Sequence, residues 1–148
     1  MKNFVVWLLI MFSVNTFAHD EAHGPQLSDA PKQGGLVASV ILFKEESLGA
    51  KAQLKRKAEI VRSQDGTVRV YFYDITMGPL KSGLLAVKAS GNLISGKKGK
   101  IKQQKFELTW KEDHFEGKSP KPTRKPYNID VKVLEGTSEL FVAFDNLD

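Results

Sequence analysis

From Leu36 onward, short segments in which apolar and polar residues alternate constrain the fold more than any other feature of this chain. In the segment 67–74, for example, Val68, Val70 and Phe72 alternate with more polar side chains. A period of two places successive side chains on opposite faces of a strand, so one face is buried and the other is wetter. The sequence predicts such strands at 36–43, 58–63, 67–74, 84–95, 106–110, 115–118, 129–133 and 140–144.

About seven or eight short strands, with turn residues at intervals of about 8–12 residues, are typical of two packed antiparallel sheets. We therefore expect an all-β fold, an immunoglobulin-like antiparallel β-sandwich, over residues 36–148. Phe72, Trp110, Val131 and Phe144 fall on the apolar faces of their segments, and we expect them to be buried between the two sheets.

Three local features refine this prediction. Gln64-Asp65-Gly66 has the composition of a hairpin connection, with glycine where a positive φ is needed. Gly91 predicts a bulge or bend within the segment 84–95. The segment 47–58 is the one helix candidate, and a loop that leads into a strand explains it equally well.

Residues 1–18 have the order of a secretory signal peptide. Lys2 gives a positive start, an apolar run extends from Phe4 to Phe12, and Thr16-Phe17-Ala18 offers small residues for a signal peptidase. The run is far shorter than the roughly 20 residues of a membrane-spanning helix. We expect a mature chain that begins at His19, has no stable membrane span, and is periplasmic or secreted.

Composition narrows the classes of protein further. The chain has no cysteine, which excludes disulfides, thiolate metal ligands and a lipid-bearing cysteine. Its net charge of +5 is spread over basic clusters at 51–57, 97–105 and 118–125, as expected of a solvated surface. No nucleic-acid partner is expected, because the aromatic residues do not interleave with the lysines as a base-stacking groove requires.

Residues 19–35 are interpreted as a flexible polar arm. They contain one large apolar side chain, Leu27, together with prolines and glycines, and the arm ends at Gly34-Gly35. Such a segment cannot bury enough apolar surface to order itself. We therefore expect the arm to add little to stability.

The histidines are the candidate metal ligands. Cleavage after Ala18 would give His19 a free α-amine, so that its amine and imidazole could bind one ion, with Asp20 or Glu21 and His23 within reach. Imidazole, amine and carboxylate suit Cu(II), Ni(II) or Zn(II). His114 lies at a predicted hairpin tip, where a solvent-exposed turn residue, a further ligand to the same ion and a general base are the three interpretations. The predicted metal ligands are His19, Asp20, His23 and His114.

Catalytic residues are not predicted. The serines lack the glycine-rich elbow of a nucleophile, and most aspartates fall at strand ends or turns, where short acidic side chains bond the local backbone. We therefore expect a non-enzymatic protein without a certain cofactor.

Several short motifs resemble a known group of proteins. They are His23-Gly24, Gly34-Gly35-Leu-Val, Ala58-Glu-Ile-Val, Asp65-Gly-Thr-Val-Arg-Val-Tyr-Phe-Tyr-Asp74, Gly78-Pro79-Leu80, Phe106-Glu-Leu-Thr-Trp110 and Phe115-Glu-Gly-Lys-Ser-Pro120. The pattern, over residues 33–144, is similar to small exported β-sandwich proteins found near, or fused to, adaptor subunits of periplasmic heavy-metal efflux systems. The resemblance implies the sandwich fold and an association with metal efflux.

Three functions are consistent with these observations. The first is an exported non-enzymatic binding domain that handles Cu, Zn or Ni and has a metal-efflux component as its partner. The second is a structural or interaction module of the cell envelope that pairs with a protein through an exposed strand edge. The third is a secreted copper enzyme in which a side chain such as His114 completes a histidine brace at His19.

Overall fold

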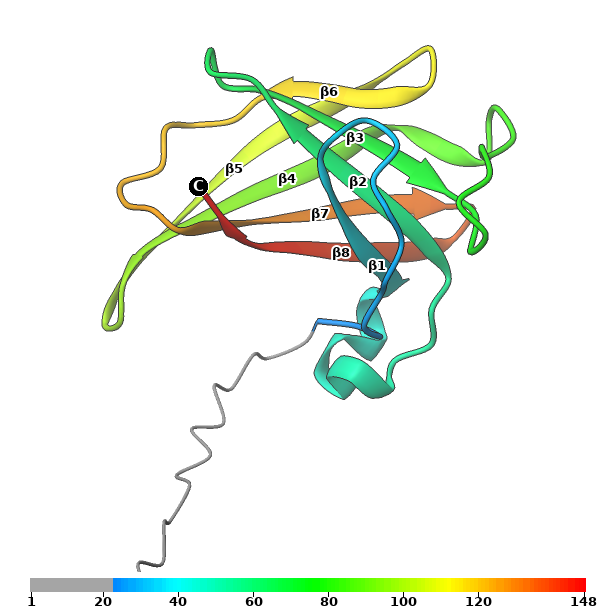
Figure 1. Ribbon diagram of the computed structural model, residues 1–148, viewed down its shortest axis with the longest axis horizontal. Helices are drawn as coiled ribbons and strands as arrows, with labels where there is room; N and C mark the ends of the chain where they lie inside the picture. The colour runs from blue at the N-terminus through cyan, green and yellow to red at the C-terminus, as the bar shows by residue number, and fades with distance from the viewer. Residues whose placement is uncertain (1–22) are drawn as a thin grey trace, which may run out of the picture.

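The computed structural model describes residues 23–148, which form eight strands and one short 3₁₀ helix (Figure 1). The all-β prediction is confirmed, and each predicted strand overlaps an observed one. The elements are β1 (Leu36–Leu42), η1 (Phe43–Lys51), β2 (Arg56–Arg62), β3 (Thr67–Tyr73), β4 (Leu85–Lys97), β5 (Lys100–Lys111), β6 (His114–Lys118), β7 (Tyr127–Glu135) and β8 (Ser138–Leu147).

The sandwich prediction is wrong, because the strands close into one antiparallel barrel. The order around the barrel is β1-β2-β3-β6-β5-β4-β7-β8, and β8 pairs with β1 to complete it, with Val40 opposite Val142. Each of the eight strands therefore has a partner on both sides. A sandwich and a barrel require the same alternation along each strand and differ only in which strands pair, so the pattern could not distinguish them.

Two long connections set this strand order. Strands β4, β5 and β6 follow one another as hairpins, and β7 then returns to lie beside β4, which is a Greek-key arrangement. Residues 74–84 join β3 to β4, and residues 119–126 join β6 to β7. In Figure 1 these two connections lie at opposite ends of the barrel.

The barrel interior is packed with apolar side chains. Phe72, Val131 and Phe144 are buried there, as predicted, although they line a barrel and not a space between two sheets. Trp110 is half-buried and packs edge-on against Phe115, with 5.1 Å between the ring centroids. Close packing of the interior accounts for a stable fold without disulfides.

The local predictions have mixed outcomes. The 64–66 turn is a hairpin connection, and Gly66 has a φ of +85°. Gly91 does not mark a bulge, because the register shift lies between Leu85 and Ala89. A Cβ atom on Gly91 would lie 2.4 Å from the Phe106 ring, so this glycine makes room for an aromatic side chain. The helix begins and ends earlier than the 47–58 candidate.

Residues 23–35 run along the outer wall of β1 and β2 before the chain enters β1 (Figure 1), and we call them the strap. The strap is tied down chiefly by Glu59, whose side chain is fully buried outside the barrel core. The carboxylate accepts backbone N–H bonds from Lys32 at 2.9 Å and from Gln33 and Gly35 at 2.8 Å each. Composition predicted an arm that adds little to stability, because it carries no information on these hydrogen bonds.

Further contacts hold the strap along its length. The Tyr73 hydroxyl donates to Glu59 at 3.2 Å, and burial together with this carboxylate raises the pKa of Tyr73 to about 12. Asp29 pairs with the nearly buried Lys57 at 2.7 Å. The Ser39 hydroxyl donates to the carbonyl of Pro25. The strap is therefore a part of the folded wall in the structure.

Candidate functional site

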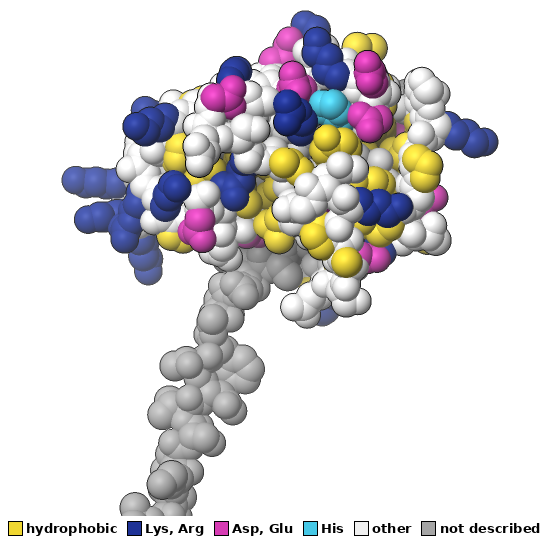
Figure 2. All heavy atoms as spheres, turned by 45° about the horizontal axis from the view of Figure 1, so that its top comes forward, with side chains coloured by type: hydrophobic (Ala, Val, Ile, Leu, Met, Phe, Trp, Pro, Cys, Tyr) yellow, Lys and Arg dark blue, Asp and Glu magenta, His cyan; other side chains and the backbone are white. Residues whose placement is uncertain are grey.

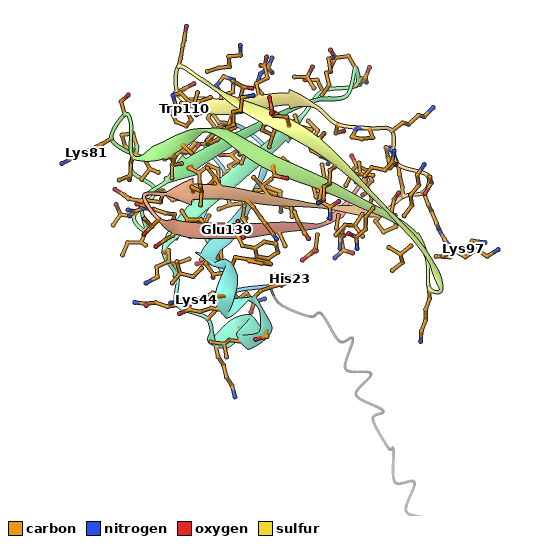
Figure 3. The ribbon with its side chains drawn as sticks, turned by 180° about the vertical axis from the view of Figure 1, so that it is seen from behind. His23, Lys44, Lys81, Lys97, Trp110 and Glu139 are labelled. Carbon is orange, nitrogen blue, oxygen red and sulfur yellow. The ribbon has the colours of Figure 1, made fainter. Side chains whose placement is uncertain are left out.

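His23 lies at the start of the strap, next to η1 and β8 (Figure 3). Its Nδ1 is 4.0 Å from Glu46 Oε1, and its Nε2 is 3.9 Å from Asp145 Oδ1. The ring packs edge-on against Phe141, with 6.2 Å between centroids, and 29% of the side chain is exposed. One imidazole thus faces a carboxylate at each of its two nitrogens.

The local backbone explains why His23 reaches this position. Gly24 lies so close to β1 that a Cβ atom on it would be 2.8 Å from the Cβ of Ser39. The next residue, Pro25, accepts the Ser39 hydroxyl bond. The strap therefore contacts β1 directly after His23, through the small Gly24 and the carbonyl of Pro25. This contact fixes the backbone so that the imidazole points toward η1 and β8.

Asp130, on the outward face of β7, adds a third carboxyl group to this neighbourhood. The pKa of Asp130 is raised to about 6, chiefly by burial, with the negative charges of Asp145 and Glu46 acting in the same direction and His23 and Lys132 in the opposite one. The cluster of His23, Glu46, Asp130 and Asp145 therefore draws on the strap, η1, β7 and β8, and we call it the strap-end cluster.

A surface groove of about 500 Å³ adjoins the strap-end cluster. Glu46 and Asp130 line it together with the aromatic rings of Phe43 and Phe141. The ammonium group of Lys132 lies 3.3 Å from the centroid of the Phe43 ring, which is a cation–π distance. The groove therefore combines aromatic walls with both acidic and basic side chains, the latter being Lys88, Lys105 and Lys132.

The strap-end cluster is not a complete metal site by itself. Within residues 23–148, no group of three or more His, Asp or Glu side chains has the arrangement needed to hold a metal ion. His19 and Asp20, two of the predicted ligands, lie outside the described residues. Of the four predicted ligands, the structure therefore places His23 and His114.

His114 is on the opposite side of the barrel from His23. It begins β6, and three strands separate β6 from β8 in either direction around the barrel. Its Nδ1 is 2.7 Å from Asp113 Oδ1, and its Nε2 is 3.6 Å from Glu116 Oε2. In this fold His114 cannot join an ion bound at His23.

The surroundings of His114 also differ from those of an exposed turn residue. Only 16% of its side chain is exposed, and its ring lies against Tyr71 with 4.9 Å between centroids. Glu116 bonds Arg69 at 2.8 Å, and this bond lowers the pKa of its carboxyl group. His114 therefore packs on Tyr71 of the β3–β6 wall beside two carboxyl groups, of which Asp113 is largely exposed and Glu116 partly exposed.

Sequence reasoning missed Glu46, Asp130 and Asp145 as neighbours of His23. They occur far apart in the chain, and no motif joins them, so spacing carries no signal of the cluster. The signal that could have been used is weak: Asp130 is an acidic residue inside an alternating strand, at a position that faces away from the core.

No family model, curated protein or solved structure matches this chain. The resemblance to domains associated with metal efflux therefore stays a prediction. None of the helices in the described part of the chain has the length and apolar character needed to cross a membrane.

Proposed function

We propose that this chain is an exported, non-enzymatic binding domain that captures a divalent metal ion, Cu(II), Zn(II) or Ni(II), at the strap-end cluster. The observation that carries the proposal is the spacing at His23. The 3.9 Å between its Nε2 and Asp145 Oδ1 is too long for a hydrogen bond. With metal–ligand bonds of about 2.0–2.2 Å, two ligands of one ion lie about 3.4 Å apart in a tetrahedral site and about 4.2 Å apart when they are opposite each other, so an ion fits between these two atoms.

The other ring nitrogen supports the same arrangement. With an ion at Nε2, the Nδ1–H group faces Glu46, whose Oε1 is 4.0 Å away. Metal-binding histidines usually donate their second N–H to a carboxylate, which sets the tautomer and the ring orientation, and Glu46 would have to move about 1 Å closer to accept that bond. Glu46 is therefore assigned an orienting role, and Asp145 a ligand role.

The remaining ligands come from the residues that precede the strap. A chain of four residues spans at most about 14 Å, so His19 and Asp20 are within covalent reach of an ion at His23. The amine and imidazole of a mature N-terminus at His19 would complete the donor set. An efflux component is the natural recipient of the ion, as the resemblance implies.

Calorimetric titration with Cu(II), Zn(II) and Ni(II) tests the proposal on the mature chain that begins at His19. His23→Ala should weaken binding at least about tenfold, and Asp145→Asn severalfold. His114→Ala is the matched control and should leave the affinity unchanged, because it removes an imidazole from the opposite wall. Equal affinities in all of these proteins, or no binding in the micromolar range, would overturn the proposal.

The interaction module and the copper enzyme, the two alternative functions, are less well supported than metal binding. Pairing through an exposed strand edge has no support, because each described strand is paired on both sides. A histidine brace completed by His114 would need that residue beside the strap, and the barrel order separates them.

A further inference from the structure

Two basic segments that are distant in the sequence meet at one end of the barrel. One is the tip of the β4–β5 hairpin, residues 97–102, and the other is the connection 119–126 between β6 and β7 (Figure 1). Hydrogen bonds connect Ser95, which precedes the hairpin tip, with Thr123 in the middle of the connection: Ser95 Oγ lies 3.0 Å from Thr123 Oγ1 and accepts the Thr123 N–H at 3.2 Å. We call the two segments together the basic end.

Within residues 23–148, the cations of the basic end have no acidic partners. Seven exposed residues make no ion pair with any described side chain: Lys97, Lys98, Lys100, Lys102, Lys121, Arg124 and Lys125. The nearby Asp65 is already bonded to Lys118 at 2.5 Å. Figure 2 shows Lys and Arg side chains projecting together at the left of the molecule, and Figure 3 shows Lys97 at the hairpin tip.

An apolar side chain accompanies these charges. Ile101 is 62% exposed although it lies between Lys100 and Lys102 in a strand. Water is an unfavourable environment for this side chain, whereas the boundary between lipid headgroups and acyl chains accommodates an apolar group ringed by lysines.

A groove opens beside the connection 119–126. It has a volume of about 710 Å³ and is lined by Arg62, Lys121, Arg124 and Lys125, among others. The Tyr127 ring in this groove is covered by Arg62, whose guanidinium carbon is 5.4 Å from the ring centroid. A covered ring is not a platform for stacking bases, which disfavours a nucleic acid.

We propose that the basic end docks on the surface of an anionic phospholipid bilayer, with the lysines on headgroup phosphates and Ile101 at the headgroup–acyl boundary. Each lysine or arginine near such a surface contributes about 1 kcal/mol, so seven convergent cations suffice for reversible binding. This inference does not depend on the proposed metal site, which lies on the wall formed by η1, β7 and β8.

Sedimentation with vesicles tests the proposal on the mature chain. Vesicles of phosphatidylcholine alone should not bind it, whereas vesicles that also contain phosphatidylglycerol should, and about 0.5 M salt should release it. Replacing Lys97, Lys98, Lys100 and Lys102 by Gln should weaken binding at least about twentyfold. Ile101→Ser should weaken it severalfold, without a change in net charge.

The matched control replaces Lys44, Lys51, Lys81 and Lys111 by Gln, which removes the same charge from exposed sites away from the basic end. It should keep most of the affinity, and both fourfold variants should keep the parental circular dichroism spectrum. Equal losses in the two variants would overturn the proposal, because net charge alone would then explain binding. Tighter binding to a DNA duplex than to anionic vesicles at equal phosphate concentration would also overturn it.

Discussion

Two carboxyl groups on the outer wall of the barrel lie in similar positions and have opposite environments. Glu59 on β2 is covered by the strap, and Asp130 on β7 is enclosed near His23 and η1. Glu59 receives three backbone N–H groups and the Tyr73 hydroxyl. Asp130 instead lies near two further acidic side chains, Asp145 and Glu46.

The comparison shows that a buried carboxylate stabilises a fold when hydrogen-bond partners compensate for the cost of its burial. The carboxylate of Glu59 accepts backbone N–H bonds that tie a separate segment to the wall. At Asp130 the burial and the neighbouring charges oppose ionisation, so the charged form is destabilised. The first region is organised for stability. The second retains an acidic cluster that stability alone does not explain.

The largest effect is expected for Glu59→Ala. It leaves three N–H groups of the strap and the buried Tyr73 hydroxyl without their acceptor, and it detaches the strap from the wall, so the free energy of unfolding should fall by about 3–5 kcal/mol. Urea denaturation measures this change. A loss below about 1 kcal/mol would mean that water replaces the carboxylate and that the strap is not held by it.

Removal of the residues up to Gln33 should lower the free energy of unfolding by about 2–3 kcal/mol, because it uncovers Glu59 and Lys57. Composition predicts instead that these residues add little to the free energy of unfolding. In the truncated chain, Glu59→Gln should cost much less than in the full chain, and this coupling measures the contact directly. Additive losses would show that strap and carboxylate act independently.

Asp130→Asn should raise the free energy of unfolding at about pH 7.5 by about 1–2 kcal/mol. The folded-state pKa of about 6 lies above the ordinary value of 3.8, so the folded form binds the proton more tightly. The contribution of Asp130 is therefore most favourable below the unfolded pKa and is lost as pH rises through about 6. Near pH 4 the variant and the parent should differ little, and an equal difference at both pH values would contradict this account.

The smallest effect is expected for Tyr73→Phe, which removes one hydrogen bond to Glu59 and keeps the ring that packs beneath Lys32. A loss of about 0.5–1.5 kcal/mol should result in the full chain. In the Glu59→Ala background the same substitution should have almost no effect. A similar loss in both backgrounds would mean that the ring environment, and not the hydroxyl, is responsible.

The sequence alone determined where the strands lie and which faces they bury. The alternation of Val68, Val70 and Phe72 identified an inward face, and Gln64-Asp65-Gly66 identified a hairpin, because both depend on neighbouring residues. His23 was predicted to bind an ion together with His19 and Asp20 or Glu21, and these three residues lie outside the described part of the chain. The carboxyl groups that the structure places beside it, from η1, β7 and β8, were not expected.

Only the tertiary structure decided the closure of the barrel, the fixed strap, and the meeting of distant groups at the strap-end cluster and the basic end. Closure rests on the pairing of β1 with β8, whose residues are about a hundred positions apart, and local periodicity carries no information on such partners. The placement of charge is also a tertiary property. The sequence shows how many lysines there are, whereas the contact between Ser95 and Thr123 brings two lysine clusters to one end of the barrel. Local patterns specify elements because neighbouring residues generate them, while sites arise from contacts between residues that are neighbours only in space.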